Sequence, residues 1–425
     1  MALLHDHSEE CAKSELDLFT LPPTQTSVEK GQYVEYHPIS NYADGGPIQF
    51  YVPGSTDEYI DPSQTKLYVK VKVTKADGAD LIDTDVVGPC NLLLHSLFSQ
   101  VDVTLNDRLI SASTPTYPYR AMIETLLSYD KWAKFSQLTA LGWVKDTAGR
   151  MDNVNCTASD TETNAGLKKR RKRILNSRTI DLIGPIHGDI FFQDRHLING
   201  VDLKVKLIPS SNSFCLMASG ENPTYKIKIV DATLFVRRVT LSSAVMLGHM
   251  KALEKGTAKY PLRRVVCKML SVPRGNLTLT QDHVFLGQLP NRIVVGCVPN
   301  AVFNGSFSKK PFNFQHFNVN YVALHVNGEQ IQHTPLKPGM DKMYMNEGND
   351  ITPSDYPDGY ALYAFDLTPD LACGGHFSLV KHGNLRLDMH FAQPLDETIN
   401  IIIYAEFNNI LEIDQAHNII FDFNS

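Results

Sequence analysis

Six consecutive cations, Lys168, Lys169, Arg170, Arg171, Lys172 and Arg173, are the strongest charged feature of a chain whose formal net charge is −6. Because like charges repel one another and resist burial, the run predicts an exposed loop or helix start, unless an anionic partner neutralises it. The polar stretch at 153–166 favours a loop. Three interpretations stay open: a solvated loop, a nuclear-import signal, and a contact to the phosphates of a nucleic acid.

Other residue types that could do chemistry do not form a convincing site. His5 and His7 could ligate a metal, but two solvated side chains in an arm are the preferred interpretation. Asp350, Asp355 and Asp358 have oxygens that calcium accepts, without the spacing of an EF-hand. His390 and Glu406 are the nearest candidates for a cupin-type metal enzyme, yet no HxH motif accompanies them. We therefore predict no catalytic, cofactor or metal site, and a protein that is not an enzyme.

The histidines on or beside predicted strands are likewise not interpreted as a site. His187, His196, His376, His382 and His390 lie on or beside predicted strands and are interpreted as residues of polar faces.

Composition bounds the class of protein. At 425 residues, with 43% hydrophobic and 20% charged residues, the chain has room for two or three globular domains. The acidic balance excludes a surface that is basic all over, as nucleic-acid platforms are. Seven scattered cysteines without a CxxC motif disfavour a disulfide framework and a zinc finger. No signal peptide and no membrane span are recognised, so we expect a soluble protein made inside the cell.

One strand-and-turn pattern occurs twice. In VDVTLNDRLI, residues 101–110, alternating apolar residues lead to Asn106-Asp107, and in VALHVNGEQI, residues 322–331, they lead to Asn327-Gly328. Both dipeptides tolerate the positive φ of a tight hairpin turn. Another strand is clear from the alternation at 66–73, where Leu and Val residues are separated by polar ones. The sequence therefore predicts two related hairpins, one in each half.

The doubling extends to two later strands. VDLKVKL at 201–207 corresponds to LRLDMHF at 385–391, and the strand at 225–239 corresponds to the strand at 399–413. Corresponding elements occur in the same order with unequal spacing, which predicts one fold built twice with unequal loops. Helices are expected only at 117–132 and 242–256.

These patterns predict an all-β chain of two tandem eight-stranded jelly-roll β-sandwiches with a few short helices. Periodicity alone leaves an immunoglobulin-like sandwich open. The expected organisation is an N-terminal arm at 1–29, a first jelly roll at 30–242, a connecting helix at 243–257, and a second jelly roll with a C-terminal tail at 258–425.

Several segments across about 47–370 carry a resemblance to a known family. They are PYRAMIETLLSY, FFQDRHLINGVDLKVKL, KALEKGTAKYPLRRVVCK and PFNFQHFNVNY. With them the sequence resembles the hexon-type, double jelly-roll major capsid proteins of adintoviruses and Maverick/Polinton elements. The resemblance implies a homotrimer with pseudo-hexagonal outline that builds an icosahedral shell, in which two domains in each of three chains give six similar edges.

Partners and location are also implied by this resemblance. They are neighbouring capsomers, penton and minor capsid proteins, and weak contact of the basic run with packaged DNA. The location is the virion capsid, assembled inside the host cell, with the nucleus as one site of assembly. The family offers no catalytic residues, and the short loops imply a low outward tower.

The alternative is a tandem β-sandwich module that binds carbohydrate or protein. Tyr117, Tyr119 and Trp132 would be its aromatic platform. For Tyr117 and Tyr119, however, a place in the core or at a helix entry is the preferred interpretation.

Overall fold

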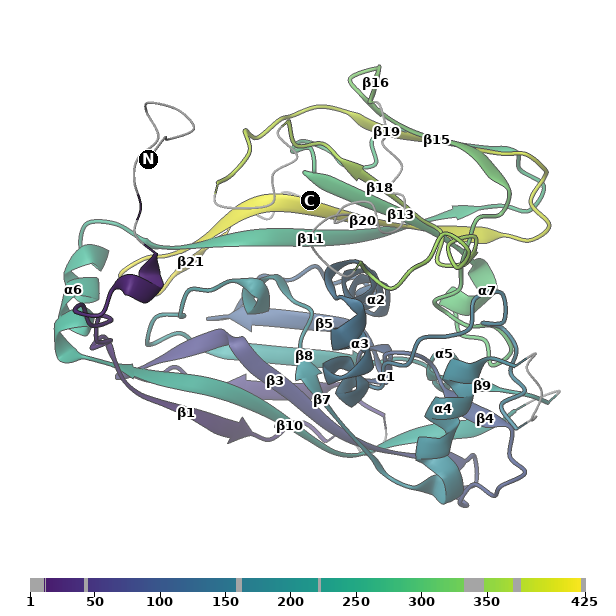
Figure 1. Cartoon of the computed structure of the whole chain (residues 1–425), viewed down its shortest axis with the longest axis horizontal. Coiled ribbons are helices and arrows are strands. Elements are labelled where there is room, and N and C mark those ends of the chain that lie inside the picture. The colour runs from purple at the N-terminus through teal and green to yellow at the C-terminus, as the bar shows by residue number, and fades with distance from the viewer. Residues whose placement is uncertain are drawn as a thin grey trace.

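Nearly all the strands belong to two β-sandwiches that lie one above the other (Figure 1). The structure is a computed structural model and describes residues 11, 13–41, 45–157, 163–220, 223–331, 348–369 and 376–421. In the first sandwich, one sheet contains, in spatial order, β1 (Val28–Tyr36), β10 (Tyr225–Leu241), β3 (Glu58–Lys75) and β7 (Ile180–Pro185), and the other contains β2 (Ile48–Val52), β8 (Leu203–Pro209), β5 (Phe98–Leu105) and β6 (Arg108–Leu109).

The second sandwich has the same plan. One sheet contains β11 (Ala258–Val272), β20 (Ile399–Ile413), β13 (Arg292–Pro299) and β18 (Leu362–Asp366), with β21 (Ile419–Ile420) paired to β20, and the other contains β12 (Thr278–Gln281), β19 (Leu385–Phe391), β15 (Val319–Val326) and β16 (Glu329–Ile331). Two short ribbons lie outside these sheets: β4 (Val87–Pro89) with β9 (Leu216–Ala218), and β14 (Phe314–Gln315) with β17 (Asp358–Gly359).

The strand pairing decides which kind of sandwich this is. When the eight main strands of either half are counted along the chain, the first pairs with the eighth, the second with the seventh, the third with the sixth and the fourth with the fifth. All these pairs are antiparallel. Such nested pairing is a long hairpin rolled into two sheets, which is the jelly-roll topology. The immunoglobulin-like alternative is therefore wrong.

The repeated sequence patterns occupy equivalent places. The two hairpins are β5–β6 and β15–β16, the fourth and fifth strands of their halves, and the two later pairs are β8 with β19 and β10 with β20. Positive φ values at Asn106 (43°), Asp107 (67°), Asn327 (51°) and Gly328 (89°) confirm the predicted turns. The doubling read from the sequence is thus confirmed as a doubled fold.

The helices are short and lie in the connections. They are η1 (Ser14–Leu16), α1 (Leu93–Ser96), α2 (Tyr117–Ser128), α3 (Lys131–Phe135), η2 (Gln137–Leu141), α4 (Ala165–Ile174), η3 (Leu175–Ser177), η4 (Asp189–Phe192), α5 (Asn212–Cys215), α6 (Ser243–Leu253) and α7 (Asn300–Phe303). The predicted helices at 117–132 and 242–256 are confirmed as α2 with α3 and as α6. The expectation of short loops was wrong, because residues 110–179 form one long connection that contains α2, α3, η2 and α4.

Two apolar clusters hold the sandwiches together. One lies inside the second sandwich, and the larger one fills the first sandwich and continues to the outward face of β11, β20, β13 and β18. The predicted strand at 66–73 supplies Leu67, Val69, Val71 and Val73, each at most 1% exposed. Burial of a side chain of this size contributes about 1.5–3 kcal/mol. Since one cluster joins both halves, the domain boundaries given above stay a prediction.

Candidate interaction surfaces and the seam between the sandwiches

The basic run lies in helix α4 and not in a loop. Asn164 caps the helix, its side chain accepting hydrogen bonds from the backbone N–H groups of Gly166 and Leu167 at 3.1 and 3.3 Å. A Cβ atom on Gly166 would lie 2.5 Å from the carbonyl oxygen of Lys145, so only glycine fits this helix start. Of the two predicted settings, an exposed loop or a helix start, the structure shows the helix, and the loop favoured by the polar stretch at 153–166 was wrong.

One cation of the run is buried. Arg170 is 1% exposed, and its guanidinium donates to Asp146 at 2.7 Å and to the carbonyl oxygens of Pro89 and Val144, each at 2.8 Å. Lys169 and Lys172 remain exposed. The anionic partner that allows a cation of the run to be buried is therefore Asp146 of the same chain. The run contains a buried, structural arginine and lysines that face solvent.

Asp146 joins the two sandwiches. It accepts from Arg170 of the first and from the Lys310 ammonium of the second, and the Tyr360 hydroxyl donates to its backbone carbonyl at 3.0 Å. All three charged side chains are at most 2% exposed. Burial alone would raise the pKa of Asp146, but the two cations outweigh it and hold the pKa at about 2. We call Asp146, Arg170 and Lys310 the Asp146 cluster.

A second charged group crosses the same seam. Arg120 on α2 donates to Glu124 at 2.9 Å and to Asp189 at 2.7 Å, while the His187 ring contacts the other oxygen of Glu124. From the second sandwich, the Tyr404 hydroxyl on β20 lies 3.2 Å from Glu124. Burial would raise the pKa of Glu124, but Arg120 and His187 lower it to about 2. We call these five residues the Glu124 cluster.

Asp189 belongs to this cluster, and His95 lies beside it. Burial raises the pKa of Asp189 despite Arg120, and the Asp189 side chain also accepts from the backbone N–H of Val265 at 3.3 Å. His95 is 1% exposed, its ring 4.5 Å from that of His187 and its Nδ1 2.9 Å from the Tyr117 hydroxyl. Burial, and then His187, keep the pKa of His95 well below its ordinary value, so this imidazole is neutral.

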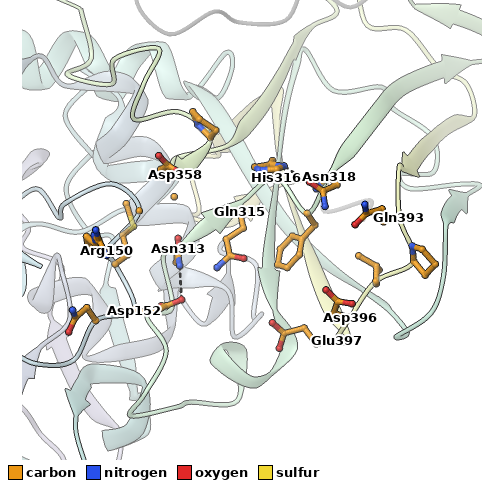
Figure 2. A pocket seen from close by; sticks show the side chains of 18 residues that line it. Arg150, Asp152, Asn313, Gln315, His316, Asn318, Asp358, Gln393, Asp396 and Glu397 are labelled. Carbon is orange, nitrogen blue, oxygen red and sulfur yellow. Dashed lines mark hydrogen bonds between the residues drawn. The ribbon is translucent and has the colours of Figure 1, made fainter. Parts of the chain in front are cut away.

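An open cleft lies where the connections of both sandwiches meet (Figure 2). It has a volume of about 570 Å³ and is lined by residues of 149–153, 313–318, 357–359 and 393–397. Asp152 accepts from the Lys310 backbone at 2.7 Å and from the Asn313 side chain at 2.8 Å, the bond drawn in Figure 2. Glu397 is held by Lys309 at 2.7 Å. The carboxylates of Asp152 and Glu397 thus serve the protein's own contacts.

No family model matches the chain. An uncharacterised protein of Caenorhabditis elegans, F54H12.2, is 24% identical over 362 residues, which cover 80% of this chain and 83% of the relative. Three solved structures are similar over nearly the whole chain. The Sputnik virophage structure by cryo-EM has a TM-score of 0.66 and 11% identity, and the match covers 100% of this chain and 95% of the other. The Faustovirus major capsid protein has a TM-score of 0.60 and 10% identity, with 92% of each chain covered, and the mavirus major capsid protein has a TM-score of 0.58 and 10% identity, with 99% of this chain and 95% of the other covered.

The chain is a double jelly roll. At identities of about a tenth, the similarity to these structures establishes the fold. Both halves of the double jelly roll are matched, because each alignment covers at least 92% of this chain.

Within the double jelly roll, the predicted aromatic platform is not assembled. Tyr117 is 7% exposed and Tyr119 1% exposed, so both belong to the core, whereas Trp132 is 63% exposed. Tyr119 packs against Phe303, Phe312 and Phe214. The preferred interpretation of both tyrosines as core residues is confirmed.

The candidate metal residues are also dispersed. His390 lies on β19 and Glu406 on β20, in different sheets of the second jelly roll. Asp350 and Asp355 pair with Lys145 at 3.6 and 3.0 Å, and Asp358 lines the cleft. In the described part of the chain, no three His, Cys, Asp or Glu residues are placed to hold a metal, and no helix has the length and apolarity to cross a bilayer. His5, His7 and Cys373 lie outside the described residues.

Sequence analysis missed the residues that join the jelly rolls. His187 was expected on a polar face and is buried at 3% exposure, while His196, His376, His382 and His390 are partly or fully exposed. Asp146, Lys310 and Arg120 are far apart along the chain, and no spacing between them indicates a contact. The one signal in the sequence was the basic run itself, because a buried cation in it would need an anionic partner elsewhere in the chain.

Proposed function

We propose that this chain is a major capsid protein of the adintovirus and Maverick/Polinton type, which forms homotrimers that build an icosahedral shell. The observation that carries the proposal is that two complete jelly rolls, joined in one chain, match the Faustovirus and mavirus major capsid proteins over at least 92% of the chain's length. Two similar domains in each of three chains present six similar edges, which suits hexagonal packing. This function is structural and needs no catalytic residue.

The buried seam supports the proposal. A shell subunit has to keep its two domains in one relative orientation, and the two charged clusters with the shared apolar cluster restrain that orientation. Buried polar groups that pair only in one geometry favour a single arrangement over sliding apolar contacts. Neighbouring capsomers, penton and minor capsid proteins are the partners proposed for the exposed edges, and the virion capsid is the proposed location.

The solution mass of the purified chain tests the function, with negative-stain images of the same sample. We expect a particle of about three chain masses, or hollow shells at high protein concentration. A protein that stays monomeric at all salt and protein concentrations would contradict the proposal. Glycan binding by such a monomer would support the alternative binding module.

For the basic run, we propose weak contact of Lys168, Lys169 and Lys172 with packaged DNA. Lys169 and Lys172 are exposed and Lys168 is partly exposed, whereas Arg170 is already paired. Contacts to phosphates release counterions, so affinity for duplex DNA should fall steeply with salt and less steeply after all three lysines are changed to alanine. Unchanged DNA binding, with loss of nuclear accumulation of a fluorescent fusion, would favour the import signal instead.

A further inference from the structure

Corresponding faces of the two jelly rolls have different surroundings. The sheets β1-β10-β3-β7 and β11-β20-β13-β18 are counterparts, because each contains the first, eighth, third and sixth strands of its half. Each sheet turns one face to its own sandwich and the other face outward. Comparison of the two outward faces shows how one jelly roll meets the next.

In the second jelly roll, the outward face is covered. Its residues Val265, Cys267, Val294, Ile402 and Tyr404 belong to the apolar cluster that fills the first jelly roll. The outward face of β11 and β20 is therefore an interior surface of the chain.

The cover comes in part from residues 186–202, the connection between the sixth and seventh strands of the first jelly roll. Asp189 accepts from the Val265 backbone, and the Tyr260 hydroxyl accepts from the backbone N–H of Ile198 at 3.0 Å. Ile190 is only 1% exposed and Phe191 3%. This connection is thus a docking segment that one jelly roll lays on the sheet of the next.

In the first jelly roll, the side chains on the equivalent outward face are exposed or partly exposed in the described structure, and two lysines there have partners, Lys70 with Asp181 at 3.6 Å and Lys72 with Asp80 at 2.8 Å. Along β3 it presents Lys66, Lys70 and Lys72, with Tyr33 of β1 49% exposed and Ile183 of β7 38% exposed. Apolar and aromatic side chains interspersed with charges are typical of surfaces that associate reversibly. We call these five residues the lysine face.

The described part of the equivalent connection in the second jelly roll, residues 376–384, is largely exposed as well. Residues 367–384 connect its sixth and seventh strands, and within them Phe377 is 46%, Leu379 88% and Val380 56% exposed. Both segments are attached by an isolated antiparallel β-bridge. Leu197 pairs in this way with Ile60 near the start of β3, and His382 pairs with Gln288 just before β13. Each chain therefore presents one open face and one open docking segment.

We propose that the segment around Phe377–Val380 docks on the lysine face of a second copy of this chain, repeating between copies the contact that joins the jelly rolls within one copy. This inference rests on the proposed function and assigns its interface. A head-to-tail contact of this kind closes into a ring when its rotation allows, and otherwise grows into a filament. Both surfaces of the intermolecular contact are exposed on the folded chain, so the contact should form and dissociate without unfolding either partner.

Two sets of substitutions test the docking from both sides. One is the triple change Lys66→Glu, Lys70→Glu and Lys72→Glu, and the other is Leu379→Asp with Val380→Asp. The matched control is Lys168→Glu, Lys169→Glu and Lys172→Glu on α4, which changes the charge equally. By light scattering, we expect both test variants to dissociate at protein concentrations at least tenfold above those at which the wild type does. The control variant should match the wild type.

Lysine cross-linking of mixed isotope-labelled and unlabelled chains gives a second readout that needs no variant. Intermolecular links are expected between Lys381, beside the docking segment, and Lys66, Lys70 or Lys72. Wild-type trimers that persist in both test variants, or that cross-link only elsewhere, would overturn the docking inference and leave the capsid function standing. A wild-type chain that never associates would overturn the capsid function itself.

Discussion

Two buried charged clusters join the jelly rolls, and they are opposite in composition. The Asp146 cluster has one carboxylate and two cations, and none of the three side chains is more than 2% exposed. The Glu124 cluster has two carboxylates and one arginine, and the His187 ring and the Tyr404 hydroxyl complete it. Both hold the seam, but only the second adjoins a buried imidazole, that of His95, whose pKa burial lowers well below its ordinary value. The difference teaches that one seam can combine a constant contact with a pH-dependent one.

The largest effect is expected from Asp146→Asn. This change leaves Arg170 and Lys310 buried side by side without a counter-ion, which costs about 3–5 kcal/mol of unfolding free energy. Urea unfolding followed by tryptophan fluorescence measures it. Asp107→Asn, at an exposed pair with Lys204, is the control and should leave the midpoint unchanged. Equal midpoints for both variants would show that the Asp146 cluster does not stabilise the fold.

Glu124→Gln should have a smaller effect, of about 2–4 kcal/mol, because Arg120 keeps Asp189 as its partner. The neutral amide still reaches Tyr404 and His187, which limits the loss. The same urea titration reports the change in unfolding free energy, with Glu254→Gln, at the exposed residue that follows α6, as control. A larger loss than for Asp146→Asn would reverse the ranking of the two clusters.

The pH dependence separates the clusters. The pKa of His95 is lowered in the folded protein, so below about pH 6.5 the unfolded chain binds more protons, and stability falls by up to about 1.4 kcal/mol per pH unit. The pKa values of Glu124 and Asp146 are lowered to about 2, so the stability they contribute is complete above about pH 4.5 and is lost as the pH falls toward 2.

Thermal unfolding between pH 7 and pH 4.5 measures this difference. His95→Gln should flatten the slope in that range, and Asp146→Asn should leave the slope unchanged. If both variants keep the wild-type slope, the Glu124 cluster is not the pH-dependent part of the seam.

The smallest effect is expected from Lys310→Met, at about 1–2 kcal/mol. Burial lowers the pKa of Lys310, so its charge is costly where it lies, and Asp146 retains Arg170 as counter-ion after the change. The methionine fills a similar volume. A loss as large as that of Asp146→Asn would mean that Lys310, and not Arg170, is the main partner of Asp146.

Much of the fold could be predicted because its signals are local. The alternation from Leu67 to Val73, the Asn327-Gly328 turn and the periodicity of α2 each depend on neighbours along the chain. Since a hairpin and two later strands occur in both halves in the same order, the doubling followed without a structure. The choice between a jelly roll and an immunoglobulin-like sandwich did not follow, because it depends on pairs such as β1 with β10, which are distant in sequence.

What the sequence by itself determined is therefore the set of strands, two helices and the repeat. It also determined that six consecutive cations must each be hydrated or paired with an anion. Only the tertiary structure decided that Arg170 is buried on Asp146, that Lys310 shares this carboxylate, and that Tyr117 and Tyr119 face the core. The physical reason is the same for all of these. Secondary structure follows from interactions over a few residues, whereas burial of a charge depends on a counter-ion that only the folding of distant segments brings into contact.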